Sequence, residues 1–227
     1  MNRLLLFAVV IFFGACRNIS GSGNIEKQTR QTNSFNAINV GGDFEVEISQ
    51  GPQNVVVEAD DNIINEIETH VNDGELKIRL RDIDVSDAHM RIMISTPDIR
   101  AIKSSASANI EAKDLRSGKL LLDASSGSVI HAAVDAPEMK LETSSGGELT
   151  VSGRTKNIHA DASSGGTIDA KSLLSEHTNA QASSGGTVRI HASVSLDAKA
   201  NSGGVIKYTG NPSVTQNTGS GGEVEKQ

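Results

Sequence analysis

Apolar and polar residues alternate along the second half of this 227-residue chain, and corners of small residues interrupt the alternation at regular intervals. Each corner reads Ser-Ser-Gly-Gly or a close variant. With the second residue of each corner as a register mark, the marks fall at 106, 126, 145, 164, 184, 202 and 220, in steps of 20, 19, 19, 20, 18 and 18. A fixed period of this length predicts one structural unit per repeat, stacked on the unit before it.

The alternation within each repeat predicts two strands. Ahead of the mark, every second position is mostly apolar or small, as in Leu120, Leu122 and Ala124, and the residues between are mostly polar. A second alternating segment follows the glycines, which tolerate positive φ and permit a sharp corner. Residues 104–227 are therefore predicted to form an all-β fold, a right-handed parallel β-helix or solenoid with coils of about 19 residues.

Residues 33–103 are β-rich but less regular, and we expect them to form the irregular N-terminal part of the same domain. Residues 43–48 alternate cleanly, and Glu75–Leu80 does so after the turn Asn72-Asp73-Gly74. Asp60-Asp61-Asn62 is expected to cap a short helix. That helix would carry Ile63, Ile64, Ile67 and Val71.

Residues 1–15 have the pattern of a lipoprotein signal peptide. The basic start at Arg3 precedes ten apolar residues, Leu4–Phe13, a run too short to span a bilayer stably. Small residues before the single cysteine, Cys16, resemble the lipobox of bacterial lipoproteins, with Phe13 in place of the usual leucine. The resemblance implies cleavage before Cys16 and lipidation of that residue, and several acyl chains anchor a protein firmly. The alternative is an ordinary secreted protein with an unmodified cysteine.

The segment after the signal is expected to be a flexible tether over residues 16–32, because Ser20-Gly21-Ser22-Gly23 is typical of linkers. The expected location is the cell envelope, as an outer-membrane lipoprotein. Residues 17–20 lack a decisive sorting pattern, so the surface and periplasmic faces both stay open.

The composition disfavours several partners. The net charge is −7 without any Lys/Arg run, which argues against nucleic-acid binding. One cysteine allows no internal disulfide framework. Beyond the signal, the aromatic residues are Phe35, Phe44 and Tyr208, so side chains that stack on sugar rings or bases are scarce. No cofactor is expected.

One column of acidic residues is the main candidate site. Asp123, Glu142 and Asp161 occupy the same position, three residues before the mark, and would stack on consecutive coils about 4.8 Å apart. Like charges at this spacing repel, raise one another's pKa or share a cation, so weak Ca²⁺ binding is one hypothesis. A solvated polar face, with Lys140 and His159 diluting the charge, is the favoured alternative.

Catalytic patterns are not evident in the sequence. It has no Gly-x-Ser-x-Gly elbow and no phosphate loop, and its six histidines show no metal-ligand spacing. The serines at the marks are expected to point inward and satisfy backbone groups at the corners. Lys103 and Arg189 are the basic residues near the ladder that an enzyme would use.

The chain resembles the DUF2807 family, described as a putative auto-transporter adhesin with a head GIN domain. The motifs that carry the resemblance are Phe35-x-x-Ile38, Gly42-Asp43-Phe44-Glu45-Val46-x-Ile48-x-Gln50-Gly51, Val55-x-Val57-x-Ala59-Asp60, Gly74-x-Leu76-x-Ile78 and the Ser-Ser-Gly-Gly ladder. The resemblance covers roughly residues 30 to 224. It implies exported or lipidated proteins of Bacteroidetes-type bacteria, and it supplies no catalytic residues.

These observations predict an exported, lipid-anchored, non-catalytic β-solenoid that serves as an adhesin-like binder or as an envelope scaffold. The expected partner is a protein or a glycan, with the oligomeric state open. Two alternatives remain, a polysaccharide-active β-helix enzyme that uses Asp161, and a periplasmic regulatory lipoprotein.

Overall fold

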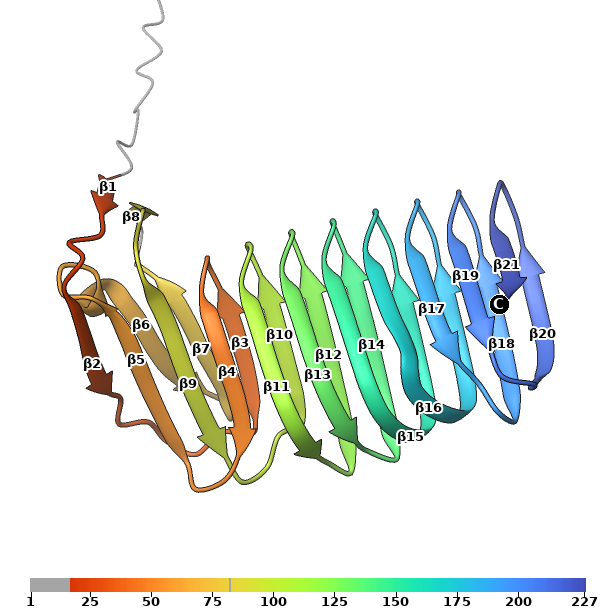
Figure 1. The fold of residues 1–227 in the computed structure, drawn as a ribbon, viewed down its shortest axis with the longest axis horizontal. Coiled ribbons are helices and arrows are strands. Elements are labelled where there is room, and N and C mark those ends of the chain that lie inside the picture. Colours follow the sequence, from red (N-terminus) through yellow and green to blue (C-terminus); the bar gives the residue numbers. More distant parts are fainter. Residues whose placement is uncertain (1–16, 82) are drawn as a thin grey trace, which may run out of the picture.

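The computed structural model describes residues 17–81 and 83–227. Most of this part of the chain is strand, and its only helix is the short 3₁₀ helix η1 (Ile64–Glu66). The strands form an elongated, flattened β-solenoid (Figure 1). The described residues contain no helix with the length and apolar character of a membrane span.

Each coil has two sides, which we call the pre-turn face and the post-turn face according to whether the strand enters or leaves the corner. In spatial order, the pre-turn face contains β7 (Glu75–Leu80), β3 (Ala37–Gly41), β10 (Ala101–Ser105), β12 (Lys119–Ser125), β14 (Glu138–Ser144), the second halves of β15 (Glu148–Ala162) and β16 (Thr167–Ala182), β18 (Ser195–Ala200) and β20 (Ser213–Thr218). The post-turn face contains β9 (Met90–Thr96), β4 (Glu45–Gln50), β11 (Asn109–Arg116), β13 (Val129–Asp135), the first halves of β15 and β16, β17 (Thr187–His191), β19 (Val205–Thr209) and β21 (Glu223–Lys226). All these neighbours pair in parallel, which confirms the predicted solenoid.

The predicted corners are tight turns with two left-handed residues. Ser126 and Gly127 have φ of 53° and 76°, and the N–H of Ser128 donates to the carbonyl of Ser125 at 3.1 Å. Positive φ at both central residues is the pattern of a type I′ turn. In corners that end in two glycines, the second glycine meets a different constraint. At the corner that ends in Gly186, an added Cβ on this residue would lie 2.2 Å from the carbonyl oxygen of Ala162.

The expectation that the serines at the marks point inward is wrong. Ser126 is exposed, because the left-handed turn directs it to solvent. The buried hydroxyl belongs to Ser128, which is fully buried and donates to the carbonyl of Ser104 at 2.9 Å. Ser128 also accepts the N–H of Ser125 at 3.0 Å, so it satisfies one backbone group of its own corner and one of the neighbouring coil.

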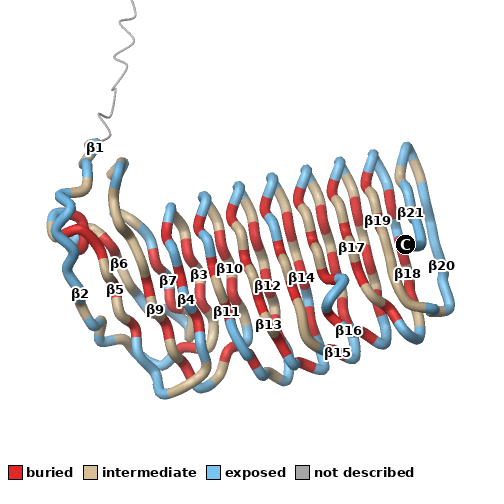
Figure 2. Tube along the Cα trace, viewed as in Figure 1, coloured by how far each residue is buried: buried red, intermediate tan, exposed pale blue. Residues whose placement is uncertain are grey.

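The core is a narrow layer between the two faces. Burial alternates along each strand, as in β12, where Leu120, Leu122 and Ala124 are completely buried and the intervening residues are not (Figure 2). Small and branched aliphatic side chains fill this layer in the regular coils. Phe44, 1% exposed, lies nearer the N-terminal end. The narrow spacing explains why large aromatic residues are rare in the sequence.

The N-terminal end of the solenoid is built out of chain order. After β3 and β4 form a coil, the chain crosses to the outside and forms β5 (Asn54–Asp60), β6 (Ile67–Asn72), β7 and β9 before it returns to β10 beside β3. β5 is antiparallel to β9, and β2 (Ile25–Thr29) is antiparallel to β5. On the other face, β6 is antiparallel to β7. These antiparallel strands cover the parallel edges at this end (Figure 1).

The helix predicted after Asp60-Asp61-Asn62 is wrong beyond a single 3₁₀ turn. Ile64–Glu66 forms that turn without a side-chain cap, and Ile67 already begins β6. Ile63, Ile64 and Ile67 are buried, because they close the end of the core. Tertiary burial thus overrides the local capping signal.

The tether predicted for residues 16–32 also differs from the structure over its described part. β1 (Arg17–Ser20) pairs in parallel with β8 (Ile83–Ser86), and β2 occupies residues 25–29. The N–H of Gly23 donates to Asp60 at 2.6 Å, and the side-chain amide of Asn62 donates to the carbonyl of Ser20 at 2.8 Å. This described part of the predicted tether, which we call the N-terminal arm, is therefore held by tertiary contacts. Cys16 and the predicted signal peptide lie outside the described residues.

Candidate functional site

The predicted acidic column exists. The register of β12, β14 and β15 places Asp123 opposite Glu142, and Glu142 opposite Asp161, on the outer side of the pre-turn face. All three side chains are partly exposed. The column follows from the period, because parallel in-register strands place equivalent positions of successive coils side by side.

Lysines partly neutralise this column. The ammonium group of Lys140 lies 2.7 Å from Glu142, and this hydrogen bond raises the pKa of Lys140. Burial raises the pKa of Asp123, and the charge of Glu142 raises it further, whereas Lys103 and Lys140 act in the opposite direction. The described residues contain no group of three or more His, Cys, Asp or Glu side chains arranged to hold a metal. Calcium binding stays a hypothesis.

A surface that the sequence analysis did not recognise continues from this column toward the C-terminus. We call it the polar grid, and it comprises alternate residues of 157–161 on β15, 177–181 on β16, 195–199 on β18 and 213–217 on β20. The pairing of these strands aligns the residues in three columns along the solenoid. Each residue is at least partly exposed.

Side-chain hydrogen bonds run between coils of the polar grid. His159 bonds to Asn179 at 3.0 Å, and His177 bonds to Ser195 at 2.9 Å. A shallow hollow of about 350 Å³ lies along the columns that contain His177, Asn179 and Asp197. The sequence predicted neither bond, since His159 was expected only to dilute the charge of the acidic column and the histidines show no metal-ligand spacing. Asparagine at outward strand positions was the available signal, because asparagine is depleted in strands.

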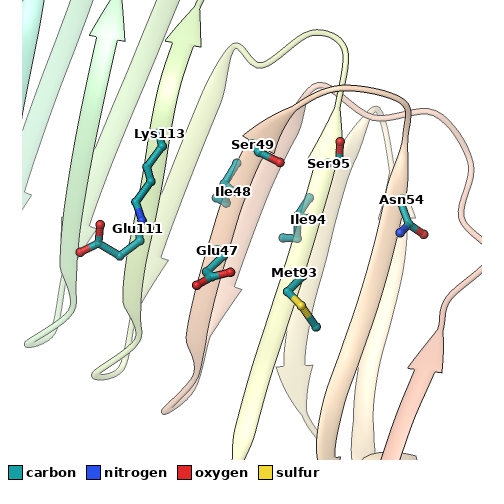
Figure 3. A pocket seen from close by; sticks show the side chains of 9 residues that line it. All are labelled: Glu47, Ile48, Ser49, Asn54, Met93, Ile94, Ser95, Glu111 and Lys113. Atoms are coloured by element: carbon teal, nitrogen blue, oxygen red, sulfur yellow. The ribbon is translucent and has the colours of Figure 1, made fainter.

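A second pocket lies on the post-turn face near the N-terminal end (Figure 3). Met93 of β9, Glu47 of β4 and Glu111 of β11 form a row across three paired strands, with Lys113 farther along β11. Arg91 already binds Glu47 at 2.6 Å. The pocket volume is about 210 Å³. This volume is below the range of roughly 300–1,000 Å³ that is usual for small-molecule sites.

Of the two basic residues considered for an enzyme, Lys103 alone lies at the acidic column, where it is paired opposite Asp123 of β12. Lys103 binds Glu75 at 2.8 Å and thereby lowers the pKa of Glu75. Arg189 lies on β17 of the post-turn face, opposite Asp169. Asp161 lies on the pre-turn face, so the core separates it from Arg189.

The two-faced stack of short parallel strands defines an extended β-solenoid repeat protein. The chain belongs to the DUF2807 family, described as "Putative auto-transporter adhesin, head GIN domain", whose profile matches residues 34–212. This match confirms the resemblance seen in the sequence motifs. Among curated proteins, none matches the chain.

Solved structures share the fold. A putative adhesin from Bacteroides fragilis aligns with a TM-score of 0.85 and 19% identity, over 92% of this chain and 99% of that one. A putative adhesin from Parabacteroides merdae aligns with a TM-score of 0.75 and 18% identity, over 93% of this chain and all of that one. A structure from Parabacteroides distasonis described as a putative lipid binding protein has a TM-score of 0.75 and 19% identity, over 93% and 100%. At these identities the likeness concerns the fold alone.

Proposed function

We propose that this protein is an exported, lipid-anchored, non-catalytic adhesin that binds its partner through the outer faces of the solenoid. The observation that carries the proposal is the set of long, in-register columns of exposed polar side chains on a rigid stack of coils. Solenoids create extended surfaces of this kind, on which successive repeats present equivalent groups to one partner. The family description supports a role in adhesion.

The proposed anchor rests on the sequence of the N-terminus. An apolar run followed by small residues and the only cysteine of the chain supports export and lipidation at Cys16. The described chain begins in β1 immediately after this residue. A lipid on Cys16 would therefore be joined to the folded head with almost no linker.

Protease shaving and antibody labelling of intact cells would test the location. Wild type would be compared with Cys16→Ala and with Ser126→Ala, a matched control at an exposed corner of the solenoid. Surface labelling that is retained on wild-type and Ser126→Ala cells and lost from Cys16→Ala cells supports the anchored adhesin. Full protection in intact cells, with the protein in the membrane fraction, contradicts surface adhesion and favours a periplasmic scaffold.

Adhesion itself needs a separate measurement. Cells that display the protein would be compared with deletion cells for attachment to immobilised glycans and matrix proteins. Protein-dependent attachment supports the proposal, and equal attachment of both strains contradicts it.

A further inference from the structure

We infer that the polar grid binds a neutral polyhydroxylated chain, a glycan, laid along the solenoid axis. The inference rests on the proposed binding function and names the ligand class and the face that meets it. Four side chains of the grid carry an amide group, namely Asn157, Asn179, Gln181 and Asn217. An amide donates and accepts at once, as a sugar hydroxyl does, so the two groups complement each other.

The residue types of the grid work against the local preference for strand. Asparagine is depleted in strands, and β-branched residues are preferred there. On the post-turn face of the same coils, one outward column holds Thr167, Thr187 and Val205, which have the favoured side chains. The next outward column is charged, with Asp169, Arg189 and Lys207, and neither column contains an amide. The pre-turn face therefore retains amides and imidazoles where threonine would stabilise the strand. Local departures of this kind are expected at functional surfaces.

The geometry suits a repetitive ligand. Polar side chains occupy equivalent positions in successive coils, about 4.8 Å apart along the axis. The bonds between His159 and Asn179 and between His177 and Ser195 hold several of these side chains in position before a ligand arrives. Such ordering lowers the entropic cost of binding. The shallow hollow of about 350 Å³ crosses consecutive coils, so one chain can contact several of them.

The low charge of the grid and its lack of aromatic and arginine side chains disfavour other partners. Three residues of the grid carry full charges, Asp161, Asp197 and Lys199, and the last two lie 3.9 Å apart. A strongly acidic or basic ligand would find little to pair with. The grid contains no Trp, Tyr, Phe or Arg. Trp, Tyr and Arg are the side chains that usually dominate protein–protein interfaces. Without aromatic stacking, each sugar binds weakly, and affinity must accumulate along the chain.

The test uses the purified protein on an array of neutral and acidic glycans, followed by calorimetric titration with a soluble neutral β-glucan series of increasing length. We expect binding to neutral chains that strengthens with length. Asn179→Thr and His177→Thr are the informative variants, because threonine preserves or improves strand stability. Each is expected to weaken binding about fivefold, which corresponds to one net hydrogen bond. Thr187→Asn, at an outward position of the opposite face, is the matched control and should bind as wild type does.

Several outcomes would overturn the inference. Unchanged affinity in both threonine variants would place the glycan elsewhere, and an array without any neutral hit would remove the ligand class. Attachment of cells to an immobilised matrix protein, combined with a blank glycan array, would reject the glycan and leave the proposed adhesin function standing. Neutral-glycan binding by the purified protein, without cell attachment, would reject adhesion and leave the binding face standing.

Discussion

The carboxylate of Asp60 accepts a hydrogen bond from the N–H of Gly23 at 2.6 Å, although 37 residues separate the two in the chain. The same carboxylate accepts the N–H of His89 at 2.7 Å, and Asp60 is only 2% exposed. Asp60 therefore joins the N-terminal arm to the loop that precedes β9, and we call these two hydrogen bonds the clasp. With the proposed lipid on Cys16, this clasp would orient the solenoid relative to the membrane, a task that a flexible linker cannot perform.

Asp60→Ala should release the arm. The N–H groups of Gly23 and His89 lose a charged acceptor, so we expect the free energy of unfolding to fall by about 2–3 kcal/mol. Hydrogen exchange should accelerate at residues 18–24 more than in the coils. The control is Asp61→Ala, which removes the more exposed bond between Ser22 and Asp61 and should change stability by less than about 0.5 kcal/mol. Unchanged exchange of the arm in Asp60→Ala would refute the clasp.

The clasp should also open in acid. Burial raises the pKa of Asp60, but N–H groups of His89, Gly23 and Asp60 itself lower it by more, so the net pKa lies below the ordinary value of about 3.9. Its stabilisation is complete above that value and is lost as the pH falls through the lower pKa of the folded protein. Limited proteolysis of the arm should therefore increase only below about pH 4. In Asp60→Asn this pH dependence should be absent, and an identical profile in both proteins would contradict the assignment.

The two glycines of one corner should respond differently to alanine. Gly186→Ala places a methyl group against the carbonyl of Ala162, so the coils must separate, and we expect a loss of at least about 3 kcal/mol. Gly185 has a φ of 76° and open space around its Cβ position, so Gly185→Ala should cost only about 1–2 kcal/mol of left-handed strain. Denaturant unfolding measures both. Equal losses would show that backbone conformation alone, and not coil spacing, constrains the corner.

Asp123→Asn should stabilise the protein at neutral pH. The raised pKa of Asp123, due first to burial and then to Glu142, means that ionisation costs stability as the pH rises through that pKa. Because the group is partly exposed, we expect a gain of only a few tenths of a kcal/mol at pH 7 and none at pH 3. Thermal unfolding at the two pH values measures the difference. A loss at pH 7 would mean that the carboxylate is stabilised by a partner.

A loss of stability in Asp123→Asn at pH 7 would implicate bound calcium as the stabilising partner. If the acidic column binds Ca²⁺, added calcium should raise the Tm of wild type and leave Asp123→Asn unchanged. Lys199→Gln, at the same column position two coils beyond Asp161, serves as the control and should respond as wild type does. Equal responses of all three proteins would remove the calcium hypothesis.

Much of the candidate surface could be predicted from the period. Asp123, Glu142 and Asp161 form a column because parallel strands in register place residues 19 positions apart side by side. The bonds of His159 and His177 could not be predicted, since they depend on side-chain geometry across coils. The local sequence indicated a wrong direction for the serines at the register marks, which were expected to point inward. The sharp turn that it predicts is present, but its left-handed φ turns Ser126 outward.

The sequence specifies the regular coils, the positions of their corners and the inward or outward direction of the side chains within the strands, because every such feature repeats at short range. The tertiary structure decides the N-terminal end, where β3 lies between β7 and β10 and the arm meets the loop at Asp60. These contacts join segments that no period relates. The strands at this end cover open sheet edges and the end of the core. Their spatial order therefore depends on long-range contacts that form only in the folded chain.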